Sequence, residues 1–392
     1  MVNRAITYCI PSKNNLRYLK NSIKSIRDNS SSDFDIIVYV DGDNDGTSEW
    51  LDSEGITYLK NESNSPMGIA YGYNRCIEAA TTPIVCMFHA DMYMGKGFDT
   101  AILKHLKPLS VVSGTRIEPP LHPKGLEKIV EDFGMYPEDF KKEEFDSFVE
   151  RTILQNKDVT TKGIFAPWAI YKEDITSIGM HDDRFHSYHE DSDIFNRFIL
   201  NGYEIVQTWE GLVYHLTCRG GQFQDGIEQV TKDESFHRMK NNAMRNYIRK
   251  WGEFVRNDAY QYPIIHPKYE VAFVINNCSE NFLNVLEPWC GRIYTDLPKE
   301  TLTNYISNEQ SNTFFDLSKR VLSIGENDPI GENDIVVSFD GRNLNNQSFK
   351  YIQQLAEIFE ANEIQNGNFE FDIFKVTITQ PNTYHTELIR YE

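Results

Sequence analysis

Strand and helix signals alternate along the first hundred residues, and this alternation constrains the fold more than any other feature of the chain. Apolar, strand-like runs cover residues 5–10, 35–40, 56–60 and 83–88. Helical spacing of apolar side chains lies between them at 16–26 and 68–80. Strands that alternate with helices form βαβ units, so we predict an α/β fold around a mainly parallel central sheet. Such sheets bind ligands at the carboxyl ends of their strands.

The same pattern returns after an acidic stretch at 127–150, which we interpret as a solvated helical insertion and, as a less favoured alternative, as a lid on the acceptor side. Further elements are expected at 194–200 (helix), 203–207 and 211–215 (strands) and 236–255 (amphipathic helix). The proline-containing segment 260–268 interrupts the pattern, and a smaller α/β unit follows it. We therefore predict two domains, 1–262 and 263–392, the second of unknown role.

Charge and composition exclude several classes of protein. The formal charge is −19, from 39 basic and 58 acidic residues, which argues against a protein that coats nucleic acid. No apolar run reaches the roughly 18 residues that a spanning helix needs, and the N-terminal sequence lacks a signal-peptide layout. A cytoplasmic location is expected, in the host cell if the protein is viral. The six cysteines form no CxxC pair, which indicates reduced thiols rather than a zinc cage.

Three polar clusters could carry chemistry. The turn at 41–47 (DGDNDGT) follows a strand and suits a cation, a base or a ribose, although an ordinary polar turn has the same composition. An EF-hand is a poor fit, because Asp52 stands where that loop needs Glu. His89 and Asp91 follow another strand, where they suit a divalent metal or form a surface pair.

The third cluster precedes the predicted helix at 194–200. Ser192 and Asp193 suit a helix cap, which favours negative charge. The adjacent carboxylates Glu190 and Asp191 are less well explained by capping. If they face a cleft, each raises the pKa of the other, as a general base requires. His215, at the end of a strand, by itself favours a structural role over a functional one.

One helix is basic in an acidic chain, and its side chains either face solvent or contact phosphate groups. These residues are Arg238, Lys240, Arg245, Arg249, Lys250 and Arg256.

Together, in this order and spacing, these pieces resemble the family 2 glycosyltransferases of the GT-A (nucleotide-diphospho-sugar transferase, Rossmann-like) fold, over roughly residues 5–252. The matching pieces are Pro11-Ser12-Lys13-Asn14, the 41–47 turn, Gly68 with Asn74, His89-Ala90-Asp91, Gly179 to Phe185 with Glu190-Asp191-Ser192-Asp193, Arg197 and Gly202-Tyr203, Val213-Tyr214-His215, and Lys250-Trp251-Gly252.

The resemblance implies a nucleotide-sugar donor, a UDP-sugar being the first expectation, and a glycan or another hydroxyl compound as acceptor. It implies Mn²⁺ or Mg²⁺ held by Asp91 and His215, with Asp191 as the base and Glu190 orienting the acceptor. It places the donor on Pro11, Ser12, Asn14, Asp41, Asp43, Gly68, Asn74, His89 and Asp91. Acceptor contacts are expected from Trp168, Tyr188 and Arg219, although the two aromatic residues are equally compatible with a place in the core.

Two departures from the family pattern leave alternatives open. His89 stands where the family has the first Asp of Asp-x-Asp, so a contact to the ribose changes or the metal gains an imidazole ligand. Val40 stands where the family has the first of two Asp residues, which affects a base contact. One base opposite the leaving group implies inversion.

Two other functions are compatible with the same sequence. The layout with a short extra domain resembles enzymes of phages and other viruses, so a hydroxylated base in modified DNA is an alternative acceptor, supported only by the basic helix. An inactive nucleotide-sugar-binding module is the other alternative, suggested by His89.

Overall fold

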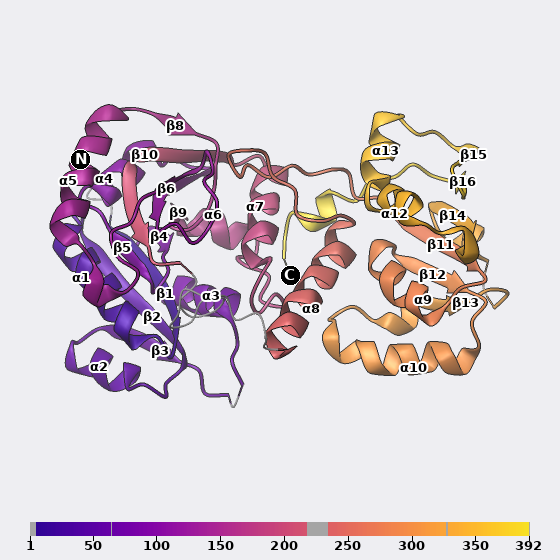
Figure 1. The fold of residues 1–392 in the computed structure, drawn as a ribbon, viewed down its shortest axis with the longest axis horizontal. Coiled ribbons are helices and arrows are strands. Elements are labelled where there is room, and N and C mark those ends of the chain that lie inside the picture. The colour runs from indigo at the N-terminus through magenta and orange to yellow at the C-terminus, as the bar shows by residue number, and fades with distance from the viewer. Residues whose placement is uncertain (1–4, 64, 218–233, 327, 392) are drawn as a thin grey trace. The chain divides into compact units, whose positions relative to one another are not determined.

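The apolar runs near the N-terminus become the strands of a ten-stranded sheet. The computed structural model describes residues 5–63, 65–217, 234–326 and 328–391. The chain divides into two units, which are described separately (Figure 1). Unit 1 comprises Met1–His237, Asn257–Ile264 and Ile389–Glu392, and unit 2 comprises Arg238–Arg256 and Ile265–Leu388. The predicted domain boundaries, 1–262 and 263–392, stay a prediction.

The sheet of unit 1 has the strand order β3-β2-β1-β4-β9-β6-β10-β5. Parallel pairs join β1 to β2 and β4, β2 to β3, and β6 to β10, whereas β9 and β5 run antiparallel to their neighbours. The sheet is therefore mixed but largely parallel, which confirms the predicted α/β class. Its strands are β1 (Ile6–Lys13), β2 (Phe34–Gly42), β3 (Thr57–Lys60), β4 (Ile84–Met87), β5 (Met92–Met94), β6 (Ser110–Glu118), β9 (Trp168–Tyr171) and β10 (Glu204–His215), with β7 (Lys128–Val130) and β8 (Thr160–Thr161) paired at β6 and β10.

The helices of unit 1 follow the expected periodicity. In α1 the apolar residues Leu19, Ile23 and Ile26 are buried, as their helical spacing predicts. Helix α3 packs on β1 and β2 (Figure 1). The helices are α1 (Leu16–Asn29), α2 (Thr47–Ser53), α3 (Ile69–Ala79), α4 (Phe98–His105), α5 (Lys142–Gln155), α6 (Lys172–Ser177) and α7 (Glu190–Leu200), and α8 (Glu234–Trp251) leads into unit 2.

Two local predictions in unit 1 were wrong. The acidic insertion is helical only from α5 onward, and it is not merely solvated, because Phe145 and Val149 on α5 are buried in a cluster with Tyr214. The two strands expected at 203–207 and 211–215 form the single strand β10. Its register against β6 shifts between Gln207 and Leu212, so the polar residues between them sit in a bulge and do not end the strand.

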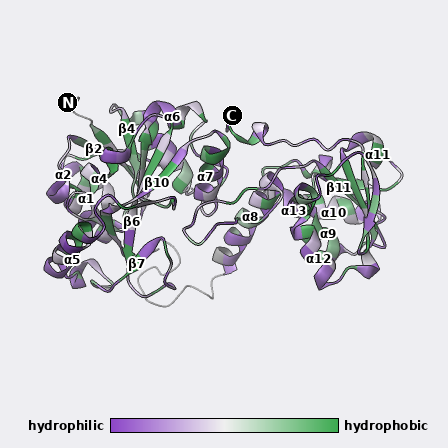
Figure 2. Cartoon of the chain, turned by 90° about the horizontal axis from the view of Figure 1, so that it is seen from above, coloured by the Kyte–Doolittle hydropathy of each residue, from purple (hydrophilic) through white to green (hydrophobic). Residues whose placement is uncertain are grey.

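Unit 2 has its own six-stranded sheet, in the order β13-β12-β11-β14-β16-β15. The first four strands are parallel, and β16 and β15 form an antiparallel edge. In each unit the strands are coloured mostly as hydrophobic (Figure 2). The elements are β11 (Val271–Asn276), α9 (Glu280–Leu286), β12 (Arg292–Thr295), α10 (Lys299–Glu309), β13 (Val321–Ser323), α11 (Pro329–Glu332), β14 (Ile335–Asp340), α12 (Asn346–Gln353), α13 (Leu355–Ala361), β15 (Gly367–Phe371) and β16 (Phe374–Ile378).

Three arginines that were predicted to lie on the basic helix form ion pairs within unit 2. Arg249 is fully buried and pairs with Glu287 at 2.6 Å and with Glu309 at 2.8 Å. Arg245 pairs with Glu309 at 2.9 Å, and Arg256 pairs with Glu357 at 2.8 Å. These three cations therefore neutralise acidic groups of the same unit.

Candidate active site

The ends of β4 and β10 bring together three side chains that could hold a metal ion. Beyond β4 the chain makes a turn in which the Met92 N–H donates to the His89 carbonyl at 3.2 Å. Strand β5 then runs antiparallel to β10, with Met92 opposite His215. The Leu216 N–H donates to the Asp91 carbonyl at 3.0 Å, which fixes the end of β10 beside Asp91. Residues separated by more than a hundred positions thus meet at one edge of the sheet.

The three side chains have the geometry of a metal centre. One ligand atom from each of His89, Asp91 and His215 lies within 4.8 Å of the other two. The His215 Nε2 is 3.4 Å from the Asp91 Oδ1, and the two imidazole ring centres are 5.4 Å apart. Asp91 and His215 are buried, and His89 is half-buried. Two imidazoles and one carboxylate are a donor set that fits a divalent transition ion.

The electrostatic surroundings of the two imidazoles differ. Burial and the neighbouring His215 lower the pKa of His89 to about 4, so His89 is neutral and able to act as a ligand. Burial alone would also lower the pKa of His215. The carboxylates of Asp91 and Glu118 outweigh burial and raise that pKa to about 9.

A buried carboxylate that the sequence analysis missed lies behind His215. The Glu118 Oε1 is 3.0 Å from the His215 Nδ1, and Glu118 also pairs with Arg116 at 3.1 Å and with Lys128 at 2.7 Å. Burial would raise the pKa of Glu118, but the hydrogen bond with His215 and the charges of Arg116 and Lys128 hold it well below its usual range. The available signal was the Arg-x-Glu sequence at the end of SVVSGTRIE, where an acidic and a basic residue follow a run without charges.

The residues expected to hold the base and ribose lie at the ends of β1 and β2. Asp41 accepts the Met67 N–H at 2.8 Å and the Gly68 N–H at 2.9 Å, so it braces the segment that precedes α3. Asp43 accepts from Lys60 at 2.8 Å. These carboxylates are already engaged with protein donors, and their contact with a nucleotide stays a prediction.

The motif at the end of β1 is near the same edge. Asn14 accepts the Asn44 N–H at 2.8 Å and so joins the ends of β1 and β2. Ser12 is buried next to the half-buried Pro11, and its hydroxyl has no hydrogen-bond partner within the described part of the chain. A buried hydroxyl without a partner is costly, so this group is available to a ligand or a water molecule.

Gly68 and Asn74 tie α3 to the segment that precedes the acidic pair. Gly68 has φ 92°, and a Cβ at this position would lie 1.9 Å from the His186 carbonyl oxygen. The Asn74 side chain donates to the His181 carbonyl at 2.8 Å and accepts the His181 N–H at 3.0 Å. Their spacing therefore serves a structural link here, and a direct contact with the donor stays a prediction.

The acidic pair opens α7. Tyr188 and His189 precede it with left-handed backbones, at φ 69° and 68°. The Asp191 Oδ1 accepts the Ser192 N–H at 2.6 Å. The Glu190 Oε2 is buried and has no hydrogen-bond partner among the described residues. Burial and then the charge of Asp191 raise the pKa of Glu190 to about 8, so Glu190 is protonated at neutral pH.

A buried ion pair fixes α7 to the segment before it. Arg197 and Asp193 are both fully buried and pair at 2.9 Å. Arg197 also donates to the carbonyls of Ile178 and Met180, at 2.8 and 2.5 Å. Asp193 and Arg197 of the matched pattern are thus structural, and they hold the acidic pair at the start of α7.

The three expected acceptor contacts have different outcomes. Trp168 is 2% exposed and packs edge-on against Phe195 and Phe198, so its ring belongs to the core. Tyr188 is half-buried, two residues before Glu190. Arg219 lies outside the described residues.

A family match agrees with this geometry. Residues 7–158 match the family model "Glycosyl transferase family 2". This part of the chain is therefore similar to the family 2 glycosyl transferases. The matched range includes Asp41, Gly68, His89 and Asp91, and it ends before the acidic pair and His215. For those later residues the argument rests on the geometry and on the resemblance in sequence.

Several solved glycosyltransferase structures are distantly similar to the chain. For the 1–349 part of S. aureus TarS the identity is 12% and the TM-score 0.39, covering 54% of this chain and 60% of that one. For GalNAc-T7 with UDP, GalNAc and Mn²⁺ the identity is 11% and the TM-score 0.43, and the match covers 62% of this chain and 47% of that one. For the mannosyltransferase PcManGT from Pyrobaculum calidifontis, with GDP-Man and Mn²⁺, the identity is 15% and the TM-score 0.39, and the match covers 62% of each chain.

The chain thus spans less than two thirds of the length of each of these proteins. No curated protein matches it. None of the helices in the described part of the chain is both long enough and apolar enough to cross a membrane.

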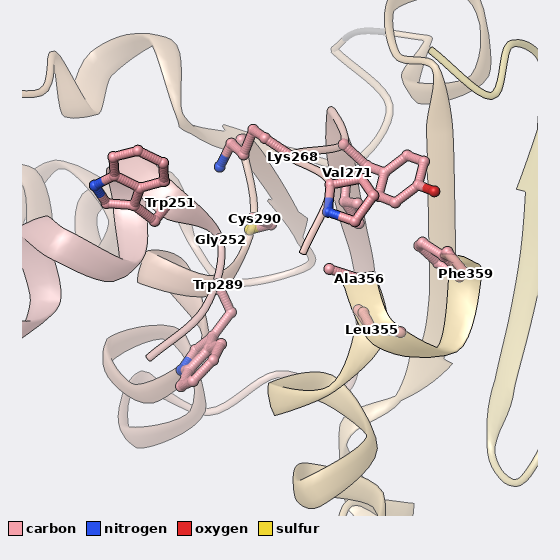
Figure 3. A pocket seen from close by; sticks show the side chains of 12 residues that line it. Trp251, Gly252, Lys268, Val271, Trp289, Cys290, Leu355, Ala356 and Phe359 are labelled. Carbon is pink, nitrogen blue, oxygen red and sulfur yellow. The ribbon is translucent and has the colours of Figure 1, made fainter. Parts of the chain in front are cut away.

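A hollow in unit 2, of about 350 Å³ including open solvent, is lined in part by Trp251 and Gly252 of the Lys250-Trp251-Gly252 motif (Figure 3). Trp251, Trp289 and Phe359 line it, together with Lys268, which donates to the Arg249 carbonyl at 3.3 Å. Burial lowers the pKa of Lys268 to about 8 and raises that of Cys290 well above its usual range. The Cys290 thiol is therefore not a nucleophile at neutral pH.

Proposed function

We propose that the protein is an inverting, metal-dependent glycosyltransferase that moves a sugar from a nucleoside-diphosphate sugar to an acceptor hydroxyl. The observation that carries the proposal is the group formed by His89, Asp91 and His215, whose ligand atoms lie within 4.8 Å of one another in a chain that matches the family 2 model over residues 7–158. A UDP-sugar is the first donor to test.

Asp91, His215 and His89 would hold the ion. A divalent ion bound there would act as a Lewis acid that neutralises the charge developing on the departing nucleoside diphosphate. Mg²⁺ prefers oxygen ligands, whereas imidazole suits transition ions, so the replacement of an Asp by His89 favours Mn²⁺ over Mg²⁺. The low pKa of His89 leaves its ring free of a competing proton at neutral pH.

Asp191 is proposed as the general base. It would take the proton of the acceptor hydroxyl while the acceptor oxygen forms its bond to the anomeric carbon. The bond from that carbon to the diphosphate oxygen breaks in the same displacement, which inverts the configuration. Glu190 is protonated at neutral pH, so it suits the orientation of the acceptor by a hydrogen bond rather than proton removal.

The acceptor is proposed to be a glycan or another hydroxyl compound rather than DNA. A DNA acceptor was suggested only by the basic helix. Arg245 and Arg249 of α8, and Arg256 beyond its end, pair with carboxylates of unit 2, so these three side chains do not form an unpaired surface for phosphates.

Release of nucleoside diphosphate tests the proposal. The full chain would be mixed with UDP-, GDP- and dTDP-sugars, with Mn²⁺ and then with EDTA. We expect slow hydrolysis of one donor that EDTA abolishes, and a loss of about 100-fold or more in Asp91→Asn. Asp35→Asn, at an exposed position on β2, is the matched control and should be unaffected.

Other outcomes separate the alternatives. Release that persists in EDTA would contradict the metal-dependent mechanism. Binding of a free nucleoside diphosphate without turnover, even after a panel of acceptors is supplied, would favour the inactive binding module.

A further inference from the structure

We propose that Glu118 is a positioning residue for the metal centre: it fixes the ring of His215 so that Nε2, and not Nδ1, faces the ion. This inference rests on the proposed function, because it concerns the same metal. Glu118 does not itself contact the donor or the acceptor in this scheme.

The direction of the hydrogen bond sets the tautomer of His215. An ionised carboxylate can only accept, so the Glu118 Oε1, 3.0 Å from Nδ1, requires the proton of His215 to sit on Nδ1. When the ring gives up its other proton to bind an ion, its lone pair is on Nε2, which is 3.4 Å from the Asp91 Oδ1 and inside the group of ligand atoms. Metal-binding histidines generally have such a partner on the second nitrogen.

Two cations, the buried Arg116 and the half-buried Lys128, keep Glu118 ionised and in place. Glu118 is 2% exposed, and the Lys128 ammonium is 2.7 Å from its Oε2. The Arg116 guanidinium is 3.1 Å from Oε1, the oxygen that faces His215. A buried charge this well paired has little freedom to rotate, so the orientation of the His215 ring is fixed before an ion arrives.

Arg116 also supports the imidazoles from a second side. Its guanidinium lies 3.8 Å from the centre of the Phe165 ring. That ring is 6.1 Å from the His89 ring and 6.5 Å from the His215 ring. Strand β6 therefore contributes, through Arg116 and Glu118, a support behind both nitrogen ligands.

Titration of Mn²⁺ into the metal-free full chain tests the inference without any measurement of turnover. We expect the Kd for Mn²⁺ to rise 10- to 100-fold in Glu118→Ala and less in Glu118→Gln, which keeps an acceptor oxygen but loses the charge. If Glu118→Ala does not fold, Glu118→Gln can be used alone, because the Gln side chain still places a polar group beside Arg116 and Lys128. Circular dichroism would establish that each variant is folded.

Glu127→Gln is the matched control. Glu127 is also a buried glutamate, and its side chain lies 3.6 Å from Arg116. Glu127 pairs with Arg116 and not with His215. The Kd of Glu127→Gln for Mn²⁺ should therefore stay within about twofold of the Kd of the unaltered chain. A general loss of charge in this network would instead weaken both variants equally, which would overturn the specific role of Glu118.

A spectroscopic measurement separates positioning from mere stability. The measurement is NMR of the chain labelled with ¹⁵N-histidine and bound to diamagnetic Zn²⁺. We expect His215 to keep its proton on Nδ1 in the unaltered chain. In Glu118→Gln we expect a different tautomer of His215 or a mixture of tautomers. Folded Glu118 variants with unchanged Mn²⁺ affinity and an unchanged His215 spectrum would overturn the inference. Failure of the unaltered chain to bind Mn²⁺ would instead overturn the metal-dependent function on which the inference depends.

Discussion

Two glutamates of the candidate site, the buried Glu118 and the half-buried Glu190, are held in opposite protonation states. Glu118, on the metal side, has paired cations at 2.7 and 3.1 Å, and its pKa lies well below its usual range. Glu190, on the acceptor side, has an oxygen without a partner in the described part of the chain, and its pKa is raised to about 8. The same side chain is thus a fixed anion in one place and a neutral acid in the other.

The difference shows how each side of the site would work. The metal side is complete in its charges before any ligand binds, because every carboxylate there faces a cation or an imidazole. The acceptor side keeps a costly, unpartnered group that an acceptor hydroxyl would satisfy. The ion pairs on the metal side therefore stabilise the folded chain, whereas the unpartnered carboxyl on the acceptor side destabilises it until a ligand supplies the missing contact.

The largest expected effect is on the acceptor side. Asp191→Asn removes the proposed base with little change in size, so we expect kcat to fall by about 10²- to 10⁴-fold. The affinities for Mn²⁺ and for the donor should change little, because Asp191 is not among the metal ligands. Steady-state kinetics and calorimetry measure the two quantities. An Asp191→Asn enzyme with near-normal kcat would show that the base is another group.

The next effect concerns the link between α3 and the segment that precedes the acidic pair. Gly68→Ala places a Cβ 1.9 Å from the His186 carbonyl, at a backbone position (φ 92°, ψ 171°) that only glycine adopts readily. We expect a loss of about 2–4 kcal/mol in unfolding free energy and a weaker site. Denaturant unfolding of unit 1, followed by a probe within it, would measure the loss.

Gly97→Ala is the matched control for that change. Gly97 also precedes a helix and has a positive φ of 85°, but its ψ of 4° lies in the left-handed region and nothing lies within 4 Å of the added Cβ. Its cost should be about 1 kcal/mol. Equal losses for the two glycines would show that the contact with His186 does not matter.

Much of the fold was predictable from local pattern. The spacing of Leu19, Ile23 and Ile26 predicted α1, and the apolar run ending at Phe88 predicted β4, because burial on one face requires such periodicity. Strand β6 was not predicted. Its pairing with β10 and β9 brings together segments that are distant in sequence, and nothing local in SVVSGTRIE states which partners it has.

The site divides in the same way. His89, Asp91 and His215 were predicted from their places at strand ends, and the structure brings them together. Glu118 was missed, because its role depends on a contact with a residue 97 positions away. The core position of Trp168 could not be predicted either. The local sequence, an aromatic residue after a proline, is the same whether the ring packs in the core or stacks on a sugar.

The smallest expected effect concerns stability and uses Glu190 directly. The pKa of Glu190 is about 8 in the folded chain and about 4.3 in an unfolded one. Between these values the folded state binds a proton that the unfolded state has lost, so the contribution of Glu190 to stability falls as the pH rises from about 4.3 to 8. Glu190→Gln has no such proton, and it should be more stable than the unaltered chain at pH 8.5 by about 1–3 kcal/mol.

Thermal unfolding at pH 4.5, 6.5 and 8.5 would measure this difference. The change in the Tm difference with pH therefore reports Glu190 together with its coupling to Asp191, at about 2–4 °C per kcal/mol. Glu62→Gln, at an exposed position of unit 1, should give a difference that is small and independent of pH. A Glu190→Gln variant that is no more stable at pH 8.5 than at pH 4.5 would mean that Glu190 is ionised like Glu118, and the contrast between the two sides of the site would fail.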